Sequence, residues 1–548
     1  MLAALALAAA ASTPMGALKF PVTGNKACNQ HFLEGMLALH SFMYEKAHEA
    51  FAAAAKADAG CAMAHWGDAM AYSHPLWGDE DMPAARAALA AVKDESKLTP
   101  KERAFLGAAR ALWGDGPLDA RQKAWLAEAD RMRRDYPGDD EVALEDALAL
   151  ITNADRNRNT RRLAQAAAIA MDVFARNPAH PGAAHYLIHA CDTPDLAILA
   201  LPAARAYAKI APAAAHALHM PSHTFVHLGM WAEAAASNEA SWAASEADYA
   251  KKKTNDGDRD WHSYAWLFAA YLEQGEVKRA EKLLTDLREL LAKSDYPGMR
   301  FAYSQLLQEF LTVTGRDADI AAWLAPLAKP LPLEAGEAAG SVGCAMHAPG
   351  GGKDVRPPFG LYAGIRAATL RAELAARAGD EAGAKSALAA RTALVAAVEK
   401  WGSLSPPKFA QRQALLDPAL LAIARATKAA TPAAWAEAAD AWGKYADAAR
   451  SPPAGPPFDP PVDLVLGELL AKAGKPKESL AAYDAALAAA PGSSTVLLGA
   501  ARAAKAAGEL PRAHDLFATL AAQWAHADEG VPGLAEVRAG AAEQHADR

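Results

Sequence analysis

The feature that most constrains the fold is a helix–turn–helix layout that recurs along the chain. Apolar residues return at helical spacing almost everywhere, and no convincing period-two strand pattern appears. Glycine interrupts each first helix, and alanine at regular offsets lets the paired helices approach closely. The copies span residues 220–247 with a turn at 229–231, 266–291 with a turn at Gly275, 464–490 with a turn at 474–476, and 496–524 with a turn at Gly508.

This layout is that of tetratricopeptide (TPR) repeats, which have a period of roughly 34 residues. The copies within 464–524 are the clearest, and those at 31–73 and 220–247 are looser. A repeat buries its apolar face only against its neighbours, so the pieces are expected to stack. The sequence therefore predicts an all-α, TPR-like helical-repeat solenoid (an α-α superhelix) with irregular loop insertions.

Proline and glycine divide this array. The stretch 451–461 carries six prolines, which have no N–H to donate and clash inside a helix. Prolines at 330 and 332 and a Gly-rich run at 348–353 bracket a second irregular stretch. We predict a TPR-like helical region with a His-rich cluster at 25–329, a Pro/Gly-rich loop at 330–357, a helical region at 358–450, a Pro-rich linker at 451–461 and a C-terminal TPR pair at 462–530.

Composition excludes several classes of protein. The 548 residues carry a net charge of −8, which argues against a general nucleic-acid binder. With 52% hydrophobic residues and a mean hydropathy of −0.07, the chain fits neither an integral membrane protein nor a disordered one. Sequence signatures for nucleotide binding (P-loop, GxGxxG after a strand) and for a GxSxG hydrolase are absent.

The N-terminus carries a short apolar run, Leu2 to Ala11, followed by small residues. It is too short to span a bilayer and lacks a basic start. We interpret residues 1–13 as a signal peptide with a truncated start, which predicts an exported, periplasmic protein. The alternative is an Ala-rich first helix.

Four cysteines are present, at positions 28, 61, 191 and 344. None has the spacing of a thiolate zinc site. Export would permit a disulfide, for which Cys28 and Cys61 are the most natural pair, although sequence alone does not fix the pairing. The alternative is that all four are buried small hydrophobes.

Histidine is unevenly spread, and thirteen of the seventeen fall in two windows, 31–74 and 180–262. In a helix, His185 and His189 share one face because they are four residues apart, and Asp192 joins them if the helix extends that far. Two His and one carboxylate could hold Zn²⁺ or Fe²⁺. His223 and His227 form a second such pair, and His219 precedes Pro221, which is expected to start a helix.

The candidate metal ligands are therefore His185, His189, Asp192, His219 and His223. Ligation by histidine without thiolate suits Zn, Cu, Fe or Ni. The candidate pocket residues are His40, His74, His180, His216, His262, Trp77 and Tyr186. The competing interpretation is that the histidines are hydrogen-bonded packing residues and that Asp192 only ends a helix. The tryptophans at 66, 77, 231 and 261 fit a helical core better than a pocket.

Over most of its length the sequence resembles a bacterial family of tetratricopeptide-repeat proteins of uncharacterised function, and two stretches carry the strongest match. They are HPGxxHYxIHxxDxP, which begins at His180, and HALHMPSH, which begins at His216. The resemblance implies that ten residues belong to a shared pattern beyond core packing: His40, His74, His180, His185, His189, Asp192, His216, His219, His223 and His262. His227 departs from it, since Arg is expected there, so His227 is left out of the site. No activity transfers with the resemblance.

Two functions follow as hypotheses. One is an exported scaffold that binds a peptide or protein on a concave face, as TPR superhelices do. The other is a metal-binding protein or metal-dependent enzyme in which the His/Asp cluster acts on a small-molecule substrate. The sequence does not decide whether the protein is an enzyme, and it names no catalytic residue.

Overall fold

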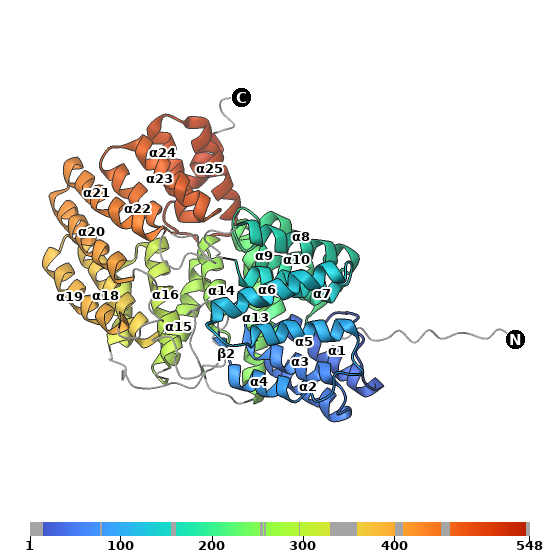
Figure 1. Ribbon diagram of the computed structural model, residues 1–548. Helices are drawn as coiled ribbons and strands as arrows, with labels where there is room; N and C mark the ends of the chain where they lie inside the picture. The colour runs from blue at the N-terminus through green and yellow to red at the C-terminus, as the bar shows by residue number, and fades with distance from the viewer. Residues whose placement is uncertain are drawn as a thin grey trace. The chain divides into compact units, whose positions relative to one another are not determined.

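The protein is all-α, with the TPR-like helical-repeat fold that the sequence predicts (Figure 1). The computed structural model describes residues 15–76, 79–154, 160–252, 256, 259–294, 296–328, 359–399, 409–450 and 461–543. The predicted signal peptide at 1–13, the loop at 330–357, nearly all of the linker at 451–461, Trp77 and Cys344 lie outside these residues. The predicted domain boundaries therefore stay predictions.

Contacts between Cα atoms divide the chain into two compact units. Unit 1 comprises residues 1–76, 80–191 and 199–221, and unit 2 comprises 77–79, 192–198 and 222–548. The division passes directly through the His-rich window, because His189 belongs to unit 1 whereas Asp192 and His223 belong to unit 2.

Unit 1 is a series of helices, most of which pack against the next one along the chain. They are α1 (Lys26–His40), α2 (Tyr44–Ala57), α3 (Ala62–Ala71), α4 (Met82–Ala90), α5 (Pro100–Leu112), α6 (Leu118–Asp135), α7 (Asp140–Thr152), α8 (Thr160–Arg176), α9 (Pro181–Ala190), most of α10 (Ala197–Ile210) and α11 (Ala215–His219). Two short strands, β1 (Ser73–His74) and β2 (Asp79–Glu80), pair between α3 and α4. Helix α9 also packs on α1 and α7, which places the last turn of α1 beside the start of α9.

One packing device in unit 1 uses an aromatic ring held between two glycines. The ring of Phe51 on α2 lies where a Cβ on Gly35 of α1 or on Gly67 of α3 would stand, at 2.5 and 2.4 Å. The missing Cβ atoms let the three helices approach one another around the ring. A disulfide joins Cys28 of α1 to Cys61 at the start of α3, the pair that the sequence analysis favours. Cys191 is a buried thiol.

Unit 2 is also a series of helices. Its helices are α12 (Pro221–His227), α13 (Trp231–Lys252), α14 (Trp261–Glu273), α15 (Val277–Leu291), α16 (Pro297–Thr314), α17 (Asp317–Trp323), η2 (Ala325–Ala328), α18 (Phe359–Arg377), α19 (Glu381–Glu399), α20 (Phe409–Ala429), α21 (Pro432–Ala449), α22 (Val462–Lys472), α23 (Pro476–Ala489), α24 (Ser494–Ala507), α25 (Leu510–Gln523) and α26 (Leu534–Glu543). The four helix–turn–helix copies predicted from the sequence are all present, and each central glycine has a positive φ.

The clearest repeat pair in unit 2 uses the same glycine–aromatic device as unit 1. The ring of Tyr483 on α23 fills the space beside Gly467 of α22 and Gly499 of α24. The sequence spacing of glycine, aromatic and glycine equals that of Gly35, Phe51 and Gly67. This repetition is independent support for a shared repeat unit in the two halves of the chain.

The C-terminal repeats of unit 2 return to the end of α14. The indole N–H groups of Trp231 and Trp524 donate to the carbonyl oxygens of Gly492 and Glu273, at 2.8 and 3.1 Å. The buried carboxylate of Glu273 accepts a hydrogen bond from the backbone N–H of Ser494, at the start of α24. Sequence periodicity did not predict this long-range closure, because it reports only neighbouring helices.

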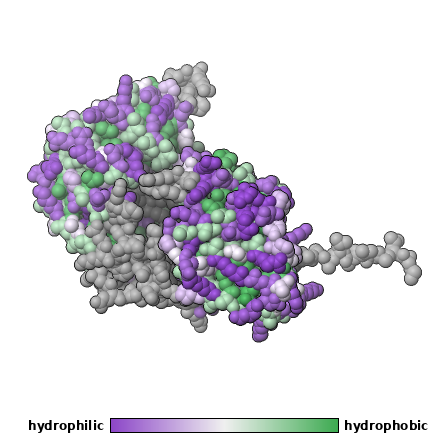
Figure 2. All heavy atoms as spheres, viewed as in Figure 1, coloured by the Kyte–Doolittle hydropathy of each residue, from purple (hydrophilic) through white to green (hydrophobic). Residues whose placement is uncertain are grey.

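The surface of the described residues is mostly hydrophilic on the face shown in Figure 2, with apolar side chains scattered over it. The large hydrophobic residues exposed among them are Met171, Ile198, Leu199 and Leu510. Within the part of the chain that the structure describes, we find no helix with both the length and the apolar character needed to cross a membrane.

Candidate functional site

Three histidine rings of unit 1 converge on one point. His185 and His189 lie one turn apart on α9, and His216 comes from α11. The Nε2 atom of His185 lies 3.0 Å from Nε2 of His189 and 3.0 Å from Nε2 of His216. One nitrogen from each ring lies within 4.8 Å of those of the other two. We call His185, His189 and His216 the His triad.

The protonation of His185 follows from its backbone partner. Its Nδ1 lies 2.6 Å from the carbonyl oxygen of His40, which can only accept, so Nδ1 carries the proton and donates it. When the ring is neutral, Nε2 is then the unprotonated nitrogen, with a single lone pair directed at the two other rings. One lone pair cannot accept two linear hydrogen bonds, so hydrogen bonding alone does not satisfy both 3.0 Å contacts.

Phe42 packs against all three rings of the triad. Its ring meets His185 edge-on at 4.4 Å between centroids and stacks on His189 and His216 at 5.7 and 5.8 Å. Phe42 has a φ of +53°, because it follows the end of α1 in a turn where the N–H groups of Phe42 and Met43 donate to Leu39 and Ala38. Glycine normally occupies that position, and a bulky residue there costs about 1–2 kcal/mol. Such strain is often found at functional sites.

A second buried cluster lies on the other side of His40. Glu141 of α7 bridges two imidazoles, with Oε2 2.8 Å from Nε2 of His40 and Oε1 2.9 Å from Nε2 of His180. The Nδ1 atom of His40 lies 3.0 Å from the hydroxyl of Tyr186. Burial alone would raise the pKa of Glu141, but the His40 charge and the hydrogen bonds from His180 and His40 outweigh it and lower this pKa to about 2. Glu141 is therefore an anion at neutral pH.

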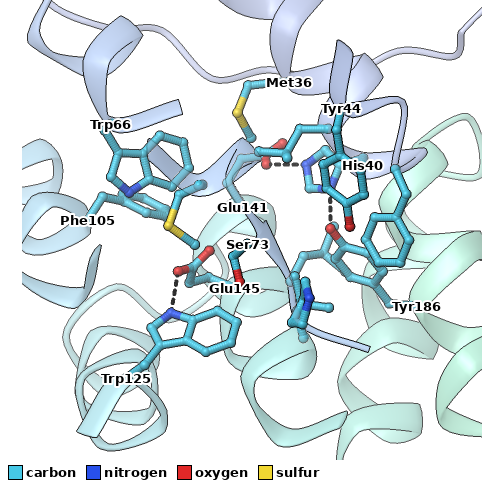
Figure 3. A pocket seen from close by; sticks show the side chains of 16 residues that line it. Met36, His40, Tyr44, Trp66, Ser73, Phe105, Trp125, Glu141, Glu145 and Tyr186 are labelled. Atoms are coloured by element: carbon cyan, nitrogen blue, oxygen red, sulfur yellow. Dashed lines mark hydrogen bonds and ion pairs between the residues drawn. The ribbon is translucent and has the colours of Figure 1, made fainter. Parts of the chain in front are cut away.

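A pocket opens beside this cluster, with an empty volume of about 520 Å³ that includes the part open to solvent (Figure 3). His40, Glu141 and Tyr186 line it, together with the aromatic rings of Phe42, Tyr44, Trp66, Phe105 and Trp125. A second carboxyl group, that of Glu145, faces it one turn along α7 and accepts a hydrogen bond from the indole N–H of Trp125 at 2.7 Å. Phe42 thus separates the pocket from the His triad.

Unit 2 holds its own histidine–carboxylate cluster. Asp192 lies 3.1 Å from Nδ1 of His223 through Oδ2 and 3.1 Å from Nε2 of His227 through Oδ1, and all three side chains are buried. The rings of His223 and His262 both pack on Trp266, at 4.3 and 5.2 Å between centroids. Burial would raise the pKa of Asp192, but the His223 charge and the hydrogen bonds from His223 and His227 hold it well below its usual value.

The structure distributes the predicted metal ligands between these clusters. His185 and His189 share one face of α9, as expected, and their third partner is His216, which the sequence analysis places among the pocket residues. Helix α9 ends at Ala190, so Asp192 does not extend that face and instead binds His223. His219 is buried on α11, with its ring 6.5 Å from that of His216.

The other predicted pocket residues also separate. His40, His180 and Tyr186 surround Glu141, His74 stacks on Tyr44 at 4.0 Å between centroids, and His262 lies in unit 2. Sequence reasoning left out two residues that the structure places in these clusters. His227 was left out of the site because it departs from the family pattern, but it is buried at Asp192. Glu141 was not considered, although Glu141 and Glu145, four residues apart and therefore on one face of a helix, were a usable signal.

Comparison with solved structures gives distant structural neighbours. No protein-family model matches the chain, and no curated protein matches it. The human IFIT1 dimer with m7Gppp-AAAA is 12% identical, with a TM-score of 0.31, over 96% of this chain and 91% of that one. Naa15/Naa10 bound to HypK-THB is 15% identical, with a TM-score of 0.26, over 82% of this chain and 67% of that one. The P58(IPK) TPR domain is 13% identical, with a TM-score of 0.19, over 95% of this chain and 99% of that one. These low scores transfer no function to this chain.

Proposed function

We propose that this protein binds a divalent transition metal ion at the His triad of unit 1. The observation that carries the proposal is the convergence of nitrogen atoms from His185, His189 and His216. Zn–N bonds of 2.0–2.1 Å in a tetrahedral site place ligand nitrogens about 3.3 Å apart. The 3.0 Å separations around His185 are close to that value, and small ring rotations account for the difference.

The surroundings of the triad also suit a metal site. Metal-binding histidines generally donate their other ring N–H to a carbonyl or carboxylate, which fixes the ring and its tautomer. The contact between His185 Nδ1 and the carbonyl oxygen of His40 is such an interaction. The absence of thiolate from the triad leaves Zn, Cu, Fe or Ni as the ions that imidazole nitrogens favour.

Three protein ligands are characteristic of catalytic rather than structural zinc sites, because a fourth position stays available for water or substrate. His216 is only partly buried, so the triad can be reached from solvent. A metal ion there would polarise a substrate or lower the pKa of bound water. We therefore favour a metal-dependent enzyme over a purely structural ion.

The scaffold hypothesis is the second candidate, and the repeat fold is the observation in its favour. TPR-like arrays typically bind peptides or proteins. Export to an oxidising compartment is part of both proposals, and the disulfide between Cys28 and Cys61 supports it.

The first experiment is elemental analysis of untagged protein purified without chelators. Wild-type protein should carry about one ion per chain, and His185→Ala, His189→Ala and His216→Ala should each lose most of it. His48→Ala is the matched control, because His48 is a unit 1 histidine that pairs with Asp68 outside the triad. Co²⁺-loaded protein should show the visible absorption of a four-coordinate ion.

Two results would contradict the metal centre. One is wild-type protein that retains no ion after loading with Zn²⁺, Cu²⁺, Fe²⁺ and Ni²⁺ in turn. The other is equal metal content in the triad variants and in His48→Ala. Circular dichroism of each variant checks that its helices are intact.

A further inference from the structure

The wall of the pocket beside His40 combines aromatic rings with carboxyl groups. Six aromatic rings line it, and Figure 3 shows Trp66, Phe105 and Trp125 on one side with Tyr44 and Tyr186 on the other. Two carboxyl groups, Glu141 and Glu145, face the same space from one side of α7. Among the described residues that line the pocket, none is Lys or Arg.

Glu145 is the group that a ligand would pair with. Its side chain is more than nine-tenths buried, and its Oε1 accepts the Trp125 indole N–H. Its other oxygen, Oε2, has no hydrogen-bond donor among the described residues. Glu141 differs, since both of its oxygens already accept from His40 and His180. A buried carboxylate oxygen without a donor is costly, so a ligand that supplies a charged donor to Oε2 would stabilise the ionised side chain.

We propose that this pocket binds an alkylammonium group, with an N–H of the ammonium donating to Oε2 of Glu145 and the alkyl chain against the aromatic wall. Ammonium groups over the faces of Trp, Tyr and Phe gain cation–π attraction, which is strongest in desolvated sites. The Glu141 anion adds long-range attraction, and an anionic ligand would be repelled by both carboxylates. The proposal does not rest on the metal centre.

The charge state of Glu145 makes binding depend on pH. Burial is the main cause that raises the pKa of Glu145 to about 7, and the nearby Glu141 and Asp146 charges add to it. An ammonium ligand favours the ionised form, so affinity should increase from pH 5 to pH 8 as the carboxyl group loses its proton. His40 and the hydroxyl of Tyr186 face the same space, and burial lowers the pKa of His40 below its usual value.

The test measures binding of n-butylammonium and of butan-1-ol, its uncharged analogue, by intrinsic tryptophan fluorescence and calorimetry. Because amines also ligate metal ions, the protein is first stripped with EDTA, and the measurement is repeated on His185→Ala. At pH 8, the ammonium should bind at least about tenfold more tightly than the alcohol in both samples. The comparison of metal-free wild-type protein with His185→Ala distinguishes the pocket proposal from the metal proposal. Loss of the His triad should leave n-butylammonium binding in the pocket unchanged.

Glu145→Gln keeps the shape of the side chain and should weaken n-butylammonium binding about tenfold or more, while butan-1-ol binding stays unchanged. Glu49→Gln, an exposed glutamate of the same unit, is the matched control. Equal affinity for ammonium and alcohol, no detectable ammonium binding, or an unaffected Glu145→Gln variant overturns the proposal. A lysine model compound, Nα-acetyl-lysine methylamide, shows where the alkylammonium group comes from. Affinity comparable to that of n-butylammonium indicates a lysine side chain of a peptide, and weaker affinity indicates a free amine.

Discussion

The backbone carbonyl oxygen of His40 accepts a hydrogen bond from Nδ1 of His185 at 2.6 Å, while the side chain of His40 binds Glu141 and Tyr186. One residue at the end of α1 therefore orients the proposed metal ligand with its backbone and lines the pocket with its ring. A change that displaces His40 should affect both sites. Gly182, directly beside the ring, offers a way to displace it without removing it.

Gly182→Ala should disturb His40 sterically. A Cβ at this position would lie 2.4 Å from Nδ1 and 2.8 Å from Cγ of the His40 ring, so the ring must shift from the position in which it binds Glu141 and Tyr186. We expect a loss of about 1–3 kcal/mol of unfolding free energy, the usual cost of overpacking, and weaker n-butylammonium binding. Urea denaturation and the fluorescence titration measure the two effects.

Gly107→Ala is the control for that variant. Gly107 lies inside α5 of the same unit, and an added Cβ would meet nothing within 4 Å. Alanine there should stabilise the helix by about 0.5–1 kcal/mol. If Gly182→Ala matches Gly107→Ala in both unfolding free energy and n-butylammonium affinity, then Gly182 does not pack against the His40 ring as the structure shows.

The fold could be predicted from the sequence because repeat stacking is a local property. Helical periodicity and the turn glycines, such as Gly275 and Gly508, determine where each helix pair begins and ends. The return of the C-terminal repeats to Glu273 could not be predicted in this way. It depends on tertiary contacts between segments far apart in the chain.

The candidate site was predictable only where its residues share one helix. Helical spacing placed His185 and His189 on one face, but their partner His216 comes from another helix. Spacing placed Asp192 with them only if the helix extended that far, and α9 ends at Ala190. Glu141 meets His40 across a long stretch of sequence, so only tertiary structure shows the pair.

Glu145→Gln should also change stability in a pH-dependent way. Burial raises the pKa of Glu145 from 4.5 to about 7, so the folded state holds this proton more tightly than the unfolded chain. The resulting stability is present below pH 4.5 and is lost as pH rises through 7, a difference on the order of 3 kcal/mol. Compared with wild type, Glu145→Gln should unfold at similar urea concentration at pH 4.5 and at higher concentration at pH 8.

The comparison of Glu145→Gln with Glu49→Gln isolates burial as the cause. Glu49 is exposed, so its replacement should leave the pH dependence of unfolding as in wild type. A stability difference between Glu145→Gln and wild type that is the same at both pH values would contradict the assigned shift.

The disulfide between Cys28 and Cys61 should stabilise unit 1. The two cysteines are 33 residues apart, and closing a loop of that length in the unfolded chain contributes about 3–4 kcal/mol in the loop-entropy model. Dithiothreitol should therefore lower the midpoint of urea unfolding for wild-type protein. The Cys28→Ser, Cys61→Ser double variant should start at the lower midpoint and show no further response to the reductant. A response that persists in the double variant would point to another disulfide.

Asp192 should stabilise unit 2 through its contacts with His223 and His227. Those contacts hold the pKa of Asp192 well below 3.8, so their contribution is present above pH 3.8 and is lost as pH falls below it. Asp192→Asn keeps the shape but removes the charge, and should cost about 1–3 kcal/mol at pH 7. Asp195→Asn is the control, because Asp195 is exposed in the same connection. Urea denaturation at pH 7 and pH 3 measures the free energy of unfolding of each protein. The difference in this free energy between Asp192→Asn and wild type should be smaller at pH 3. An equal difference in unfolding free energy at both pH values, or no difference at pH 7, would mean that the ionised carboxylate of Asp192 does not stabilise the protein through His223 and His227.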